Sequence, residues 1–241
     1  MAYQGVEVRP DGSLYCDIDV EKTFGLRYRT PTLNIPVKYD PELFKSMAEI
    51  FVTNARATCP VDTGFLRDHN DAQADKGGVE MWSEATYSVY QEYGTSRCRA
   101  QPWFESSVQL AIESTNAQDT CANLYNTYLG LEQELVIVQS MRITSIAEGQ
   151  QAIAHLRKAK DIAEGIGFPV EEIDEAIEEI EEQMAEIAMM EQQMAAMPEL
   201  GPLVTMFIQI IVGIIVGLIS SFIRNLFDFS DREESTHNPS H

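Results

Sequence analysis

The feature that most constrains this chain is an uncharged apolar run near its C-terminal end, residues 203–223. Its twenty-one residues include no Asp, Glu, Lys or Arg, and as a helix they would span about 30 Å, the thickness of a bilayer's hydrocarbon core. Gly213 and Gly217 form a G-x-x-x-G pair, which lets apolar helices approach closely. The run therefore predicts either a membrane-spanning helix or a helix buried at the centre of a symmetric oligomer. If it spans a bacterial membrane, Arg224 and Arg232 favour a cytoplasmic C-terminus.

The chain is strongly acidic, and its charge is unevenly distributed. The formal net charge is -21, yet the part before Asp161 is nearly balanced. No Lys or Arg occurs from residue 161 to residue 223. Direct binding to duplex DNA is disfavoured, because affinity for phosphates needs cationic side chains that release counterions.

Residues 131–198 predict an acidic helical hairpin. Two glycines and a proline within residues 165–169 separate two helical runs, residues 145–164 and 170–197. Behind the hairpin, residues 199–227 contain the apolar helix, and residues 228–241 are polar and predicted to be disordered.

The second run of the hairpin carries a coiled-coil seam. Its apolar positions alternate between spacings of three and four residues. They are Val170, Ile173, Ile177, Ile180, Met184 and Ile187. The opposite face is almost wholly Glu, which would repel itself in a parallel homomeric coil. Pairing with the first run, which carries Arg157, Lys158 and Lys160, is therefore more plausible, but the sequence does not determine the partner of the seam.

Residues 1–40 predict a strand or short hairpin followed by irregular chain. Apolar and polar residues alternate through residues 14–20, the period of a half-buried strand. Pro31 and Pro36 then interrupt any regular element. Two interpretations stay open: an extended arm that reaches a neighbouring subunit, or a strand packed on its own domain.

A helix is predicted over residues 41–57. Asp40, Pro41 and Glu42 supply an N-cap, a proline at the first position and an acid in the first turn. Pro60 ends the helical stretch, since the residue before proline avoids helical backbone angles. The expected buried face consists of Leu43, Met47, Ile50, Phe51, Asn54 and Ala55.

Strands and a second long helix complete a compact unit over residues 41–130. The turn at residues 76–78 is flanked by alternating segments, which predicts a strand pair. Pro102 begins the second helix, and Trp103 and Phe104 are expected in the core between that helix and the sheet. The predicted fold class is therefore α+β: a small helix–sheet–helix domain, then an all-α hairpin, then a C-terminal apolar helix.

Three short clusters in the middle third of the chain resemble a known family. They read P-V-D-T-G-F-L-R at residues 60–67, Y-S-V-Y-Q-E-Y-G-T at residues 87–95 and A-Q-P-W-F at residues 100–104. Their order is similar to that of the phage tail-component family often called gene-product-ten-like. Its members carry a P-V-D-T-G-x-L-R turn, a strand ending Y-x-x-Y-x-E-F/Y-G-T, and A-x-P-F/W-F. The motif positions here are Pro60, Asp62, Thr63, Gly64, Leu66, Arg67, Tyr87, Tyr90, Glu92, Tyr93, Gly94, Thr95, Pro102, Trp103 and Phe104.

The resemblance implies a virion structural protein of a tailed phage or prophage. Such a subunit forms an oligomeric ring at the head–tail junction or the head-proximal end of the tail, in head–tail joining or tail completion. The implied partners are further copies of the chain and neighbouring head–tail connector or tail-tube proteins. DNA passes nearby without specific binding. The implied location is the virion, and the host cytoplasm during assembly. The part behind about residue 131 has no family role to inherit.

A second hypothesis is a membrane-associated docking protein anchored by residues 203–223. A third is an aspartic hydrolase, because Asp62-Thr63-Gly64 matches the loop that carries an acidic protease's carboxylate. That chemistry needs two such loops, and the sequence has one. The structural interpretation is a turn in which Asp62 or Thr63 caps a short helical segment. Phe65 and Leu66 then anchor this turn to the core.

No catalytic, cofactor or metal site is predicted. The four cysteines, Cys16, Cys59, Cys98 and Cys121, form no C-x-x-C pair and have no His at ligand spacing. Two charged motif residues, Arg67 and Glu92, are expected to form an ion pair that ties the first two clusters together. The basic loop after Gly94, residues 96–99, is expected to contact a neighbouring ring.

Overall fold

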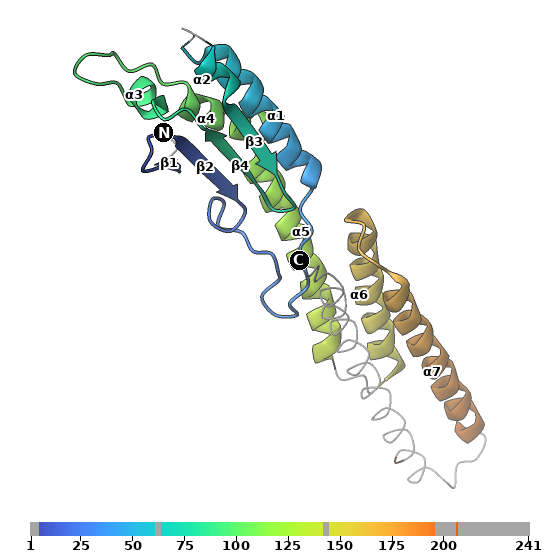
Figure 1. Cartoon of the computed structure of the whole chain (residues 1–241). Coiled ribbons are helices and arrows are strands. Elements are labelled where there is room, and N and C mark those ends of the chain that lie inside the picture. The colour runs from blue at the N-terminus through green and yellow to red at the C-terminus, as the bar shows by residue number, and fades with distance from the viewer. Residues whose placement is uncertain (1–4, 61–63, 142–144, 196–205, 207–241) are drawn as a thin grey trace, which may run out of the picture. The chain divides into compact units, whose positions relative to one another are not determined.

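The computed structural model describes residues 5–60, 64–141 and 145–195, together with Met206. Its described part combines helices with one four-stranded antiparallel sheet, which confirms the α+β class (Figure 1). The chain divides into two compact units. The first comprises residues 1–28 and 37–125, and the second comprises residues 29–36 and 126–241.

The sheet of the first unit is built from two hairpins. Its strands are β1 (Val6–Val8), β2 (Leu14–Asp19), β3 (Asn70–Ala74) and β4 (Gly78–Ser83), in the order β1-β2-β4-β3. The β1–β2 turn is closed by the Asp11 carboxylate, which accepts a hydrogen bond from the Ser13 amide at 2.9 Å. Both predicted strand regions, residues 14–20 and the pair around residues 76–78, are confirmed.

The two faces of the sheet differ as the alternating sequence predicts. The inward side chains are buried: Leu14, Cys16 and Ile18 of β2, and Val79, Met81 and Ser83 of β4. Helix α1 (Pro41–Thr58) packs against β3 and β4, and α4 (Phe104–Thr115) packs against α1 (Figure 1). The core of the first unit therefore lies between this helical layer and the inward face of the sheet.

Helix α1 begins as predicted but buries a different face. The Asp40 side chain accepts a hydrogen bond from the Glu42 amide at 3.0 Å, and Pro41 occupies the first turn. The buried residues are Phe44, Met47, Ala48, Phe51 and Ala55. The predicted Leu43, Ile50 and Asn54 are only partly buried. That part of the prediction is wrong, because the helix is rotated to place Phe44 toward the core.

The stretch predicted as an extended arm packs on its own chain. Ile35, Val37 and Tyr39 are buried, and the Tyr39 hydroxyl donates a hydrogen bond to the Arg27 carbonyl at 2.7 Å. Residues 29–36 are held within the second unit by the buried Glu132 carboxylate, described with that unit below. The second of the two open interpretations, packing within the chain, is favoured.

The long helix predicted from Pro102 is two helices. Helix α4 ends at Thr115, its C-cap residue Asn116 adopts left-handed angles with φ 50°, and α5 (Ala117–Ser140) follows directly. Asparagine tolerates this conformation better than most residues do. Trp103 and Phe104 are buried, as predicted. The Phe104 ring packs edge-on against Phe51 with 5.1 Å between centroids.

The second unit contains the predicted hairpin. Helices α6 (Ile146–Gly165) and α7 (Glu171–Ala195) pack on each other. The break between them lies at the predicted glycines and proline. The seam residues Ile173, Ile177, Ile180 and Ile187 are buried. Arg157 pairs with Glu181 and Lys160 with Asp174, each at 2.7 Å. The partner of the seam, which the sequence left undetermined, is α6 within the described chain.

The C-terminal part of α5 and residues 29–36 belong to this second unit. Glu132 of α5 accepts hydrogen bonds from the amides of Thr32 at 2.8 Å and Leu33 at 2.6 Å. Glu134 of the same helix contacts the imidazole of His155 on α6. These bonds connect α5, α6 and the segment of residues 29–36.

The apolar run falls almost entirely outside the described residues. Of residues 203–223 only Met206 is described, so Gly213, Gly217 and the tail of residues 228–241 lie outside as well. Among the residues that are described, no helix is both long enough and apolar enough to cross a membrane.

Candidate assembly surface

Glu92 joins the second and third motif clusters from inside the first unit. It lies on α3 (Ser88–Tyr93) and is only 1% exposed. Its carboxylate accepts hydrogen bonds from the backbone amides of Trp103 at 2.8 Å, Phe104 at 2.9 Å and Glu105 at 3.0 Å. These amides open α4, whose N-cap residue Trp103 supplies no capping side chain. Glu92 therefore caps α4 from another element.

The predicted ion pair between Arg67 and Glu92 is wrong. The Arg67 guanidinium instead contacts its neighbour Asp68, with 2.7 Å between Nε and Oδ1, and both side chains are exposed. That contact raises the pKa of Arg67 and lowers the pKa of Asp68 through the hydrogen bond they share. The buried Glu92 carboxylate already accepts three backbone hydrogen bonds, so its partners do not include a guanidinium.

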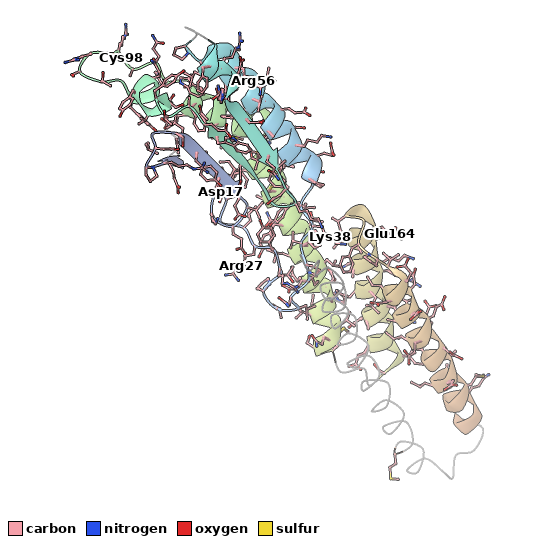
Figure 2. The ribbon with its side chains drawn as sticks, viewed as in Figure 1. Asp17, Arg27, Lys38, Arg56, Cys98 and Glu164 are labelled. Carbon is pink, nitrogen blue, oxygen red and sulfur yellow. The ribbon has the colours of Figure 1, made fainter. Side chains whose placement is uncertain are left out.

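Gly94 begins a structured basic loop after α3. Its φ is 77°, and a side chain there would place Cβ 2.6 Å from the Ala100 nitrogen. The Thr95 hydroxyl accepts hydrogen bonds from the amides of Arg97 at 3.1 Å and Cys98 at 3.0 Å. The loop backbone is thereby closed on itself, with Cys98 near its tip (Figure 2).

Gly64 opens the short helix α2 (Phe65–Asp68) with φ 84°. Leu66 is buried, as predicted, but the prediction that Phe65 anchors the turn to the core is wrong. Phe65 is 47% exposed; its ring stacks on His69 at 3.7 Å and lies 6.2 Å from the Tyr87 ring, both measured between centroids. Of the other first-cluster positions, Pro60 is partly buried. Asp62 and Thr63, with their predicted capping role, lie outside the described residues.

The tyrosines of the second cluster form the outer side of α3. Tyr87, Tyr90 and Tyr93 recur every three residues, and all are exposed, Tyr90 by 56%. Ser88 and Glu92 are the buried residues of the same helix. The residues themselves left extended or short helical form open here, and the short helix is observed; the strand that the resemblance implied is wrong. The three-residue spacing is what places the tyrosines on one side and Glu92 on the other.

Other features of the described chain lie away from these motifs. A groove of about 530 Å³ between α6 and α7 is lined by residues such as Ile153, Met184 and Ala188. A second, of about 430 Å³, lies over α1 beside Leu110. Within the described ranges no group of three His, Cys, Asp or Glu residues is arranged to hold a metal ion.

Sequence reasoning did not identify the outward face of the sheet. Tyr15 and Trp82 lie opposite each other there on β2 and β4. Burial, together with the neighbouring Glu80 and Asp17, raises the pKa of Tyr15 to about 12. A signal for this face is present in the sequence. The positions that alternate with the buried residues of β2 and β4 are mostly polar, yet they include two large aromatic residues, Tyr15 and Trp82.

A scan against protein-family models and searches of curated proteins and of solved structures each found no match to this chain.

Proposed function

We propose that this protein is a structural subunit of a tailed phage or prophage virion. In this proposal it forms an oligomeric ring at the head–tail junction or the head-proximal end of the tail. Its partners are copies of itself and the neighbouring connector or tail-tube proteins, and DNA passes without specific binding. The proposal begins from the resemblance of the three motif clusters to the gene-product-ten-like family.

The observation that carries the proposal is the set of three hydrogen bonds made by Glu92. A glutamate at the centre of a motif is used to join two motif clusters within the fold. The same short helix presents exposed tyrosines on its other side. This division suits an assembly subunit, since interfaces are enriched in Tyr and Arg held on a rigid scaffold.

The rest of the chain has a place in the same proposal. The acidic hairpin and an apolar helix at residues 203–223 gather around the symmetry axis and line the channel. An acidic lining repels DNA and lets it slide without sticking. Electron-microscopy density that placed residues 203–223 on the outer rim of a particle would rule out this arrangement.

The alternative function is membrane-associated docking, and the uncharged run of residues 203–223 favours it. In that case the first unit binds a partner and the run anchors the chain. A chain ending at about residue 197 then stays soluble, while the full chain floats with liposomes. In a ring-forming subunit, the full chain does not float.

The mass of the purified full chain, measured with and without detergent, tests the proposed function. A subunit of a ring gives one large, discrete mass in both conditions and closed rings in negative-stain images. A full chain that stays monomeric in both conditions contradicts the proposal. A mass that depends on detergent, together with flotation, supports the membrane alternative instead.

A further inference from the structure

The outward face of the sheet has the composition of a binding surface. The strand register places Glu7, Tyr15, Trp82 and Asp71 in one row across all four strands. The next row contains Asp17, Glu80 and Gln73. Because side chains alternate along a strand, all of these point away from the buried side that faces α1. The face therefore has an aromatic centre with carboxylates around it, and the Arg9 guanidinium lies over the Tyr15 ring at 4.3 Å from its centroid.

Part of this acidic charge is not neutralised within the first unit. Asp17 and Glu80 lie directly opposite each other, an arrangement of like charges that destabilises a sheet. Lys22 pairs with Asp17 at 2.8 Å. Glu80 and Asp71 are exposed and make no salt bridge within the described chain. A cationic partner would relieve this repulsion.

The basic loop after α3 offers the opposite charge. Arg97 and Arg99 are exposed, and neither forms a salt bridge among the residues that the structure describes. The loop backbone is fixed by the Thr95 hydroxyl. Next to it, Tyr90 and Tyr93 are each about half exposed. Figure 2 shows Cys98 in this loop and Asp17 on the sheet, so one unit carries both surfaces.

We propose that the basic loop and the α3 tyrosines of one copy dock on the outward sheet face of a second copy. The arginines then meet Glu80 and Asp71, which form no salt bridge among the described residues, and the tyrosines of one copy meet Tyr15 and Trp82 of the next. Because the two surfaces differ, each added copy leaves one of each kind free until a ring closes. This inference rests on the proposed ring function and names the surfaces that build the ring.

Two charge-reversal variants of the full chain test the contact. The loop variant carries Arg97→Glu and Arg99→Glu, and the sheet variant carries Asp71→Lys and Glu80→Lys. Each alone has a lower mass than the wild type, measured by light scattering after size exclusion. Mixed together, they assemble again with the two variants alternating, because the reversed loop of one meets the reversed sheet of the other, and the two unchanged surfaces also meet each other. A chain with all four changes regains the wild-type mass, since every contact is then reversed on both sides.

A matched control changes the same amount of charge elsewhere in the first unit. Arg27→Glu with Lys76→Glu alters two exposed basic side chains and leaves the mass unchanged. Tyr90→Ser is a second probe, because an exposed side chain can be shortened without harm to folding. It lowers the mass or raises the concentration at which the assembly dissociates. Near-wild-type circular dichroism shows that each variant is folded.

Cys98 gives an independent readout of the same contact. It lies in the loop and is partly exposed, whereas Cys16, Cys59 and Cys121 are buried. In the assembled wild type its thiol reacts slowly with a disulfide reagent. In the sheet variant, whose loop is unchanged, it reacts several-fold faster. Equal rates in the two proteins would overturn the inference.

The possible failures are distinguishable. A monomeric wild type contradicts the proposed function itself. In a second case, the wild type forms a large assembly whose mass is unchanged by the loop, sheet and Tyr90 substitutions. That result leaves the ring function standing and refutes these surfaces. If the variants dissociate, and neither mixing them nor combining all four substitutions in one chain restores the assembly, the two surfaces bind something other than each other. That result also overturns the inference.

Discussion

Replacing Glu92 tests the internal connection on which the candidate surface depends. The Glu92→Ala change removes the acceptor for three backbone amides at the start of α4, with N–O distances of 2.8, 2.9 and 3.0 Å. Two of those amides belong to buried residues, Trp103 and Phe104, where water cannot replace the carboxylate. The third belongs to Glu105, which is only partly buried.

The magnitude follows from these differences in burial. A buried donor left without a partner costs about 1–3 kcal/mol, so two of them cost about 2–6 kcal/mol. Loss of the one side-chain methylene, Cγ, adds about 0.8 kcal/mol from burial alone. We expect Glu92→Ala to lower the free energy of unfolding of the first unit by about 3–7 kcal/mol, from a total of about 5–15 kcal/mol. Glu92→Gln keeps one oxygen and the size, and should cost about 1–3 kcal/mol.

Urea unfolding followed by tryptophan fluorescence measures this loss. The chain has two tryptophans, Trp82 and Trp103, and both belong to the first unit, so the signal reports that unit. Glu84→Ala is the matched control, because Glu84 is exposed and its removal should change stability by about 0.5 kcal/mol or less. If Glu92→Ala unfolds within 1 kcal/mol of the control, as judged from the linear dependence on urea, the capping argument is refuted.

Three further changes test separate parts of the fold. Gly94→Ala should cost about 1–3 kcal/mol in the same fluorescence assay, because its Cβ meets loop backbone. Gly25→Ala, with φ 68° but nothing within 4 Å, should cost less, and equal losses would contradict the steric argument. Burial raises the pKa of Asp19, but hydrogen bonds from the Tyr28 hydroxyl and two backbone amides outweigh it and hold that pKa below the usual value. Its contribution is present above about pH 4 and disappears as the pH falls through the lowered pKa. Asp19→Asn should therefore flatten the acid side of the stability curve, whereas a parallel shift would refute this. Ile180→Ser in the buried seam should lower the melting temperature of the helical circular dichroism signal by several degrees, and an unchanged midpoint would show that the seam does not hold the hairpin.

The start of α1 could be predicted because capping is local. Asp40, Pro41 and Glu42 act on amides within one turn of themselves, so three residues were sufficient. The buried face could not be chosen the same way. Leu43 and Phe44 both begin sets with helical spacing, and both sets include Met47. Only packing against the sheet and α4 decides between them, and that contact joins residues far apart in the sequence.

The role of Glu92 shows a different limit. Its partners are backbone amides, which have no sequence signature. A sequence shows only charged side chains as partners for a carboxylate, and it therefore suggested Arg67. One signal was available. Helix α4 begins at Phe104 after Pro102 and Trp103, with no Ser, Thr, Asp or Asn to cap it. Such a helix start needs an acceptor from elsewhere. Glu92 is the acid of the preceding motif cluster.

The two units differ in how far their charged side chains are neutralised within one chain. In the hairpin, basic residues of α6 meet acidic residues of α7 within one chain, which is the pairing that the sequence favoured without determining it. In the first unit the same neutralisation is incomplete. Arg97 and Arg99 are exposed and form no salt bridge among the described residues, and Asp17 of β2 lies directly opposite Glu80 of β4. If a second copy completes the neutralisation, the assembly must weaken as salt rises, since exposed charges are screened beyond about 10 Å at 0.1 M salt. The hairpin ion pairs, already closed within one chain, need no second copy, so added salt should dissociate subunits before it unfolds either unit.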